Sequence, residues 1–230
     1  MFFKGLIFYF VFYIWTFCFF LVFSTVNLFS VNFTSKLSLF WSKSILKIAK
    51  YILGIKYEIE GLSNLPNTPI IVASNHQSAW ETFFLYSILK NPRIVLKEEL
   101  KKIPILSMYF KKLGFIYVNR ELGLSSIKNI LHKIKNKTLN ATRSIIIFPE
   151  GTRVDPECKN ELSTGVFVLY KNLKLPIVTI RHNSGHYWLN KNIRKKKGTI
   201  KVKIFSPISI GKDKSSVMKI LENNIYEKRN

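Results

Sequence analysis

Short apolar runs that alternate with helical patterns are the feature that most restricts the fold of this 230-residue chain. Ile70-Ile71-Val72-Ala73 and Ile145-Ile146-Ile147-Phe148 have the length and composition of buried strands. Apolar residues at helical spacing follow the first run, from about Ala79 to Leu89. Strand candidates interleaved with helical segments predict an α/β fold in which a mixed sheet is flanked by helices. The seven candidates are residues 57–60, 70–73, 93–97, 115–118, 144–148, 176–180 and 199–205.

The first polar segment of interest is Asn75-His76-Gln77-Ser78-Ala79-Trp80-Glu81, which lies where a strand candidate ends and a helix candidate begins. This is the usual place for chemistry in a layered α/β protein. A carboxylate five residues after a histidine can accept a hydrogen bond from one ring nitrogen and leave the other nitrogen able to take a proton. His76 and Glu81 are therefore candidates for a general base and its orienting acid. The alternative is a structural histidine at a strand end.

A second polar segment, Phe148-Pro149-Glu150-Gly151-Thr152-Arg153, also follows a strand candidate. Its proline and glycine end the strand and let the backbone approach a ligand closely. The planar guanidinium of Arg153 suits a phosphate. Because both polar segments fall at strand ends, we expect them to converge on one cleft.

These segments resemble motifs of the glycerolipid acyltransferases, and specifically of the 1-acyl-glycerol-3-phosphate acyltransferases. That family carries N-H-x-x-x-x-D, G-x-x-F/I-x-x-R, F-P-E-G-T-R and a proline within an apolar run, in this order. Here the order is kept by residues 75–81, residues 114–120, residues 148–153 and residues 175–180. The resemblance covers roughly residues 55–208. The chain departs from the family at Glu81, where the family usually has aspartate.

The resemblance implies transfer of an acyl chain from a thioester to the sn-2 hydroxyl of 1-acyl-glycerol-3-phosphate, which gives phosphatidic acid. His76 would act as general base on the hydroxyl, and Glu81 would hold the tautomer of the imidazole. We expect the donors for the oxyanion among the backbone N–H groups near the His76 turn. Direct transfer is expected, because neither a serine nor a cysteine lies in a nucleophile-elbow context.

The resemblance also implies a set of substrate-binding residues. Arg153 and Arg120 would hold the acceptor phosphate, with Lys97 as a weaker candidate. Glu150 would brace its loop by pairing with a neighbouring base. The full expected set is Lys97, Arg120, Glu150, Gly151, Thr152 and Arg153. The acyl donor would be acyl-CoA or an acyl-carrier protein, and we expect no other cofactor and no metal, because the sequence has no zinc-type Cys/His spacing.

The stretch from Leu6 to about Val26 is apolar, aromatic-rich and free of charge. At 1.5 Å per residue it can cross a hydrocarbon core of roughly 30 Å. A cleaved secretory signal is the alternative, but the run is long for one and no clear small-x-small site follows it. Lysines are much more frequent after the run than before it, which places the bulk of the chain on the cytoplasmic side of a membrane, with a bacterial inner membrane as the expected location.

Residues 36–53 interleave lysines with apolar side chains, which predicts an amphipathic helix at the lipid surface. A surface helix of the globular domain and a hairpin of two membrane-embedded helices are the alternatives. The chain is thus expected to divide into a membrane anchor with an amphipathic helix, residues 1–54, and an acyltransferase catalytic domain, residues 55–230.

The formal net charge of +23 predicts attraction to anions such as nucleic acid, anionic lipid or a phosphorylated substrate. The apolar N-terminus favours lipid, so the expected partners are lysophosphatidic acid, anionic phospholipids and an acyl-carrier protein, and no nucleic acid. A basic cluster, Lys191 with residues 194–197, is expected on a hairpin tip that contacts anionic lipid, and a merely solvated tip is the alternative. The remaining alternatives are another lysolipid or an acylated amino-acid lipid as acceptor, and a membrane-anchored basic binding module without catalysis.

Overall fold

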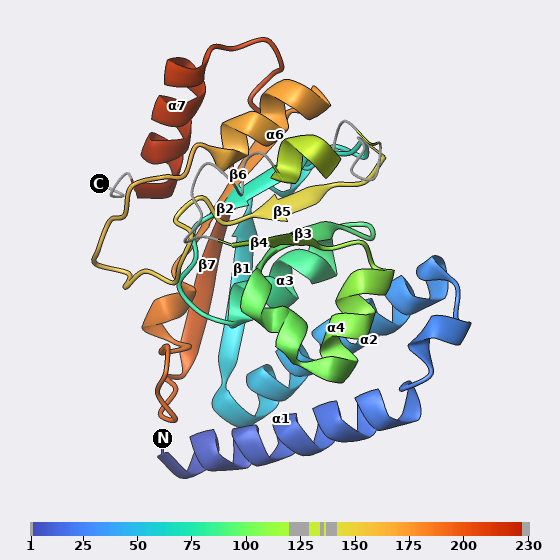
Figure 1. Cartoon of the computed structure of the whole chain (residues 1–230). Coiled ribbons are helices and arrows are strands. Elements are labelled where there is room, and N and C mark those ends of the chain that lie inside the picture. The colour runs from blue at the N-terminus through green and yellow to red at the C-terminus, as the bar shows by residue number, and fades with distance from the viewer. Residues whose placement is uncertain (1, 120–128, 134–135, 137–141, 227–230) are drawn as a thin grey trace.

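The computed structural model describes residues 2–119, 129–133, 136 and 142–226. Within these ranges the centre is a seven-stranded sheet with the order β1-β7-β6-β2-β5-β3-β4 (Figure 1). Adjacent strands are parallel, except that β6 and β7 are antiparallel. The predicted mixed α/β sheet is therefore confirmed. The strands are β1 (Ile55–Glu60), β2 (Ile71–Ser74), β3 (Arg93–Lys97), β4 (Ile116–Val118), β5 (Ile145–Ile147), β6 (Ile177–His182) and β7 (Gly198–Ile204).

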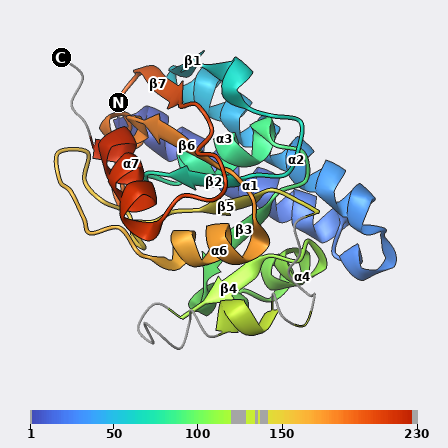
Figure 2. The ribbon, with the colours of Figure 1, turned by 90° about the horizontal axis from the view of Figure 1, so that it is seen from above.

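Helices cover both faces of the sheet (Figure 2). The α-helices are α1 (Phe2–Val22), α2 (Val31–Ile48), α3 (Trp80–Ile88), α4 (Pro104–Lys112), α6 (Gly165–Leu173) and α7 (Lys214–Tyr226). Short 3-10 or π turns are η1 (Val26–Leu28), η2 (Ala49–Leu53), η3 (Leu62–Asn64), η4 (Glu98–Lys102) and η5 (Ser184–His186). The sequence also predicts a helix over residues 123–139, from apolar residues at helical spacing, and most of it lies outside the described residues.

The central strands are apolar on both faces because each face carries its own core. Ile146 of β5 packs with the buried residues of α1, α2 and α3, whereas Ile145 and Ile147 pack with α6 and α7. Successive side chains of a strand point to opposite faces, so a continuous isoleucine run serves both layers. This explains why these strands appear in the sequence as short unbroken apolar runs.

The order in which the chain adds strands to the sheet changes direction at the adjacent parallel strands β2 and β5. From β2 it crosses through α3 on one face towards β3, and from β5 it crosses through α6 on the other face to β6. The carboxyl ends of two such parallel strands open into a crevice between the diverging crossovers. Both polar segments of the sequence, residues 75–81 and 148–153, begin at this crevice.

The two N-terminal helices form a hairpin. Trp15 Nε1 of α1 donates to Ser44 Oγ of α2 over 2.7 Å, and Trp41 Nε1 donates to Thr16 Oγ1 over 3.4 Å. Among the helices in the described part of the chain, α1 is the one that is long and apolar enough to cross a membrane. The structure thus shows that α1 and α2 pack as a helical hairpin, and the position of the two helices relative to a membrane stays a prediction.

This hairpin shares its apolar core with the sheet. Phe8 of α1 and Ile45 of α2 are fully buried in the same cluster as Val72 and Ile146. The other side of α1 exposes large apolar side chains, among them Phe3, Ile7, Phe10, Tyr13 and Phe17. A contiguous apolar face of this kind suits membrane association, because it leaves water when it enters lipid.

The sequence predicts that Pro104 breaks or kinks the apolar stretch from Glu98 to Leu113, and the structure confirms a break. The turn η4 ends at Lys102 and α4 begins at Pro104, because the first helical position needs no N–H donor.

In the basic cluster, Lys195 is only 2% exposed, with its Nζ donating to the carbonyls of Leu189 and Asn192 and lying over the ring of Tyr9. The cluster therefore belongs to a loop packed against α1, and Lys195 is not at a solvated tip.

The contact between α1 and this loop predicts the effect of adding one methyl group. A Cβ at Gly5 would overlap the carbonyl oxygen of Ile193, so Gly5→Ala should push α1 away from the loop. Overpacking of this kind costs about 1–3 kcal/mol, which lowers Tm by about 2–10 °C in a chain of this size. Thermal unfolding in detergent micelles measures the change. Ile7→Ala, on the exposed side of α1, is the control, and an equal Tm for both variants would contradict this packing.

Candidate active site

His76 and Glu81 meet at the carboxyl end of β2. The Nδ1 atom of His76 lies 2.9 Å from Oε1 of Glu81, which belongs to the first turn of α3. The same Oε1 accepts the N–H groups of Gln77 (2.8 Å) and Ser78 (2.7 Å). Oε2 accepts the hydroxyls of Ser78 (2.5 Å) and Ser184 (2.8 Å). One carboxylate therefore caps the start of α3 and holds the imidazole ring.

Glu81 is completely buried and yet ionised. Burial raises its pKa, but the neighbouring His182 and the hydrogen bonds from His76 and Ser78 outweigh burial and hold the pKa well below its usual value. Because an ionised carboxylate can only accept hydrogen bonds, Nδ1 of His76 carries the proton. Nε2 therefore keeps its lone pair and can act as a base.

His182 contributes to the site as a neutral residue. Burial lowers its pKa, and its Nε2 donates to the carbonyl of Asn75 (2.9 Å) while its Nδ1 accepts the N–H of Ser184 (3.3 Å). The nearby Glu81 carboxylate raises the pKa of His182, but burial outweighs this effect. His182 also fixes the turn, since the Asn75 amide donates to its carbonyl (2.8 Å) and accepts its N–H (3.0 Å).

The loop after β5 packs directly on His76. The ring of Phe148 stacks on the imidazole, with centroids 4.2 Å apart and planes 23° from parallel. Glu150 Oε2 accepts the His76 N–H over 2.6 Å, and the N–H of Val154 donates to the His76 carbonyl over 2.8 Å. The loop after β5 thus holds the imidazole ring, the backbone N–H and the backbone carbonyl of His76.

Glu150 braces this loop through partners other than the expected base. Its second oxygen accepts the hydroxyl of Tyr226 at the end of α7 (2.9 Å), and the other accepts the backbone of His76. The side chain is 7% exposed, and burial raises its pKa to about 7. The expectation that Glu150 pairs with a basic side chain is therefore wrong.

The expected source of the oxyanion donors is also wrong. The N–H of His76 is taken by Glu150, and those of Gln77 and Ser78 are taken by Glu81. Three consecutive backbone donors at the turn are thus committed to carboxylates. A developing oxyanion must find its donors elsewhere in the crevice.

The other expected binding residues are placed less uniformly. Arg153 is exposed in the loop after β5, with its Nη1 3.3 Å from Oδ1 of Asn190. Burial and then the charge of Arg153 lower the pKa of Lys195 to about 8, so two cations lie near each other here. Lys97 lies on β3 and forms an exposed ion pair with Glu99 (2.7 Å). Arg120 lies outside the described residues.

Gly151 and Thr152 form the tip of the second motif. Gly151 has a φ of +71°, in the left-handed region that favours glycine, and its N–H closes a turn onto the carbonyl of Phe148 (3.0 Å). Thr152 is exposed. Within the described ranges, no group of three or more His, Cys, Asp or Glu residues has an arrangement that could hold a metal ion.

Sequence reasoning missed the partners that complete the dyad. Ser184 and Tyr226 lie 103 and 76 residues from the carboxylates they contact, so no local pattern marks them. Ser78 has a local signal, because serine followed three residues later by glutamate is a capping box. This spacing predicts a carboxylate that folds back on the turn, which is what Glu81 does.

Known proteins resemble this chain in sequence and in fold. The chain is 35% identical over 164 residues to a 1-acyl-sn-glycerol-3-phosphate acyltransferase of Pseudomonas aeruginosa, covering 71% of this chain and 63% of that relative. It is 27% identical to the 1-acyl-sn-glycerol-3-phosphate acyltransferase alpha of Mus musculus, covering 70% of this chain and 58% of that relative. The match thus spans less than two thirds of the length of these relatives.

The fold is similar to the crystal structure of the 1-acyl-sn-glycerophosphate acyltransferase from Thermotoga maritima. The TM-score is 0.70 at 21% identity, over 96% of this chain and 92% of that chain. Residues 56–183 match the family model named Acyltransferase, and they contain both crevice motifs and the strands that carry them. On this match over more than half of its length, the chain belongs to the acyltransferase family.

Proposed function

We propose that this protein transfers an acyl chain from a thioester to the sn-2 hydroxyl of 1-acyl-glycerol-3-phosphate, giving phosphatidic acid. The observation that carries the proposal is the buried, ionised Glu81 that fixes His76 as a base beside the Arg153 loop. The names of the relatives in Pseudomonas aeruginosa and Mus musculus support the same acceptor.

In this reaction Nε2 of His76 takes the proton of the acceptor hydroxyl while the hydroxyl oxygen attacks the thioester carbonyl. The C–O bond forms, the C–S bond then breaks, and the imidazolium returns the proton to the leaving thiolate. Glu81 stabilises the imidazolium between these steps, because its charge lies 2.9 Å from Nδ1. A general base of this kind contributes about 10²–10⁴ in rate.

The acceptor is proposed to reach the site from the side of the N-terminal hairpin. Arg153 contacts the loop that contains Asn190, and α1 packs on the same loop at Gly5. A phosphate held at Arg153 would therefore lie next to a helix whose outer face is apolar. This arrangement suits a lysolipid whose chain stays in a membrane while its head enters the crevice.

We place this membrane contact at the cytoplasmic face of a bacterial inner membrane. The lysines of α2 are exposed and available to anionic headgroups; they are Lys36, Lys43 and Lys47. Spheroplast labelling of a cysteine introduced beyond the apolar segment decides the side.

The first test is turnover by the purified chain in detergent micelles, with lysophosphatidate and each acyl thioester, and product identification by mass spectrometry. Wild type should form phosphatidic acid, and His76→Ala should form none while it keeps the thermal unfolding of wild type. Glu81→Gln should lower kcat by about 10²–10⁴, because it leaves the base without its orienting charge. Substantial turnover by His76→Ala would remove the base assignment.

Arg153 predicts a separate effect on acceptor binding. Arg153→Ala should raise KM for lysophosphatidate about tenfold or more with a smaller change in kcat, since a charge-assisted contact is lost. The KM of Arg153→Lys should lie between those of wild type and Arg153→Ala, because lysine keeps the charge but loses the planar fork. Steady-state kinetics with lysophosphatidate and with the phosphate-free monoacylglycerol make the comparison. An equal loss with both acceptors would argue against a phosphate contact.

Glu150 predicts a pH dependence of stability. Folded Glu150 keeps its proton up to about pH 7, whereas the pKa of an unfolded glutamate is 4.5, so stability falls as pH rises through this window. Glu150→Gln keeps an acceptor for the His76 N–H and cannot ionise. Its free energy of unfolding relative to wild type should therefore rise between pH 4.5 and pH 8, by on the order of 2–3 kcal/mol. Urea unfolding across this range measures the difference, and a constant difference contradicts the prediction.

A further inference from the structure

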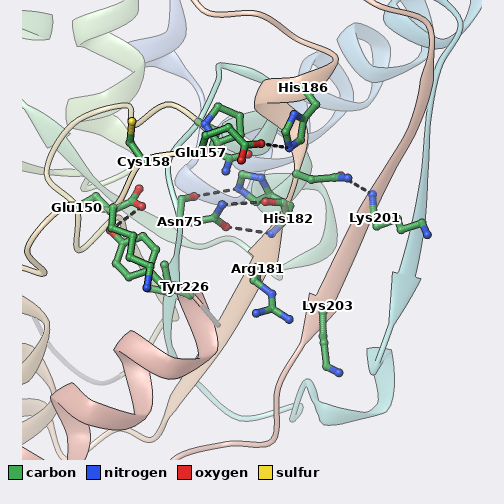
Figure 3. Close-up of a pocket in the computed structure, with 15 residues that line it drawn as sticks. Asn75, Glu150, Glu157, Cys158, Arg181, His182, His186, Lys201, Lys203 and Tyr226 are labelled. Atoms are coloured by element: carbon green, nitrogen blue, oxygen red, sulfur yellow. Dashed lines mark hydrogen bonds and ion pairs between the residues drawn. The ribbon is translucent and has the colours of Figure 1, made fainter. Parts of the chain in front are cut away.

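A cavity lies on the opposite side of the catalytic turn from the His76 ring. Its volume is about 300 Å³, and the side chains of Asn75 and Gln77, on either side of His76 in the chain, form part of its wall. The His76 ring itself stacks on Phe148, which belongs to the apolar layer of α1. The cavity instead faces the C-terminal end of α7, where Tyr226 lines it (Figure 3). It is therefore next to the reaction site but opens on the other face of the sheet.

The cavity wall carries an excess of positive charge. The carboxylates among its lining residues are Glu150 and Glu157, and Glu157 lies 3.8 Å from Nε2 of His186. Four lining side chains are cationic at neutral pH, which leaves an excess even when Glu60, the partner of Lys203, is counted. The cations are Lys159, Arg181, Lys201 and Lys203. The net positive charge of this recessed wall favours an anion over a cation.

Two of these cations face each other across neighbouring strands. Arg181 of β6 and Lys203 of β7 are directly opposite in the antiparallel pair, and both charged groups lie over the ring of Phe205, at 5.3 Å and 5.5 Å. Like charges directly opposite in a sheet are destabilising. Glu60 offsets part of this repulsion from β1, at 2.9 Å from Lys203 Nζ. Two cationic side chains are thus held next to each other on this face of the sheet.

We infer that this cavity binds the phosphate of the phosphopantetheine arm of the acyl donor. The inference rests on the proposed function. A guanidinium fork beside ammonium groups suits a phosphate ester, and the wall formed by Asn75 and Gln77 places that phosphate beside the catalytic turn. The acceptor phosphate is assigned to Arg153, which does not line this cavity.

The two faces of the molecule suit two kinds of substrate. The exposed apolar side of α1 lies on the face that carries Phe8 and Trp188, whereas Lys201 and Lys203 alternate with the core residues of β7 and point to the other face. A lipid acceptor and a water-soluble donor can thus approach from opposite sides of the sheet. The pantetheine arm would cross the turn at residues 75–77 to bring its thioester to Nε2 of His76.

The test measures binding of CoA by calorimetry to the full chain in detergent micelles. The double variant Arg181→Gln/Lys201→Gln should bind CoA at least about tenfold more weakly than wild type, and Arg181→Lys should lose less. Binding of pantetheine, which has no phosphate, should not change. The control Lys111→Gln/Lys171→Gln removes the same charge from exposed positions on α4 and α6 and should bind CoA like wild type. Thermal unfolding confirms that each variant is folded.

The same variants separate the sources of the phosphate. Weaker binding of CoA, or of an acyl-carrier protein bearing the phosphopantetheine arm, supports the proposal and identifies the donor. Equal CoA affinity of the double variant and the control, with no effect on the carrier protein, overturns it. An equal loss of pantetheine affinity overturns it as well. A cavity that binds inorganic phosphate, but whose variants leave CoA affinity unchanged, also overturns it.

Binding needs no turnover, so failure of the proposed reaction is distinguishable. A chain that binds CoA through Arg181 but forms no phosphatidic acid refutes the proposed function and keeps the phosphate site. A chain that forms phosphatidic acid with unchanged KM for acyl-CoA in the double variant refutes the phosphate site alone.

Discussion

The buried carboxylate of Glu81 is the interaction on which the site depends. A charge with no solvent contact is stable in a protein only when hydrogen bonds replace its hydration, and five donors do so here. Four of these donors come from the turn between β2 and α3, and the fifth comes from η5 after β6, while Glu81 itself belongs to α3. The carboxylate therefore joins three segments at one point, and the orientation of His76 follows from that junction. The longer side chain of glutamate reaches all five because it folds back over the turn.

The architecture was predictable where local pattern and tertiary environment agree. β3 has the predicted bounds of residues 93–97, and β2 and α3 lie within a residue or so of the pattern at residues 70–89. The pairing of His76 with Glu81 was also predictable, because both lie in one turn. These features depend on neighbours in the sequence, for which period and spacing are direct physical signals.

The rest depended on distant contacts. Nothing near Glu150 indicates that a tyrosine of α7 will bond to it, and nothing near Lys195 indicates that α1 will cover it. The apolar composition of α1 is compatible with a single span or with a hairpin, since both place apolar side chains in lipid. The oxyanion expectation was wrong for a similar reason: a backbone N–H is available only if no carboxylate has taken it, and that is a property of the folded chain.

The bond between Tyr226 and Glu150 joins the end of α7 to the loop that packs on the catalytic turn. Glu150 in turn holds the backbone of His76, so α7 supports the catalytic turn from outside the sheet. Loss of α7 would therefore loosen the seat of the imidazole ring while it removes no strand of the sheet.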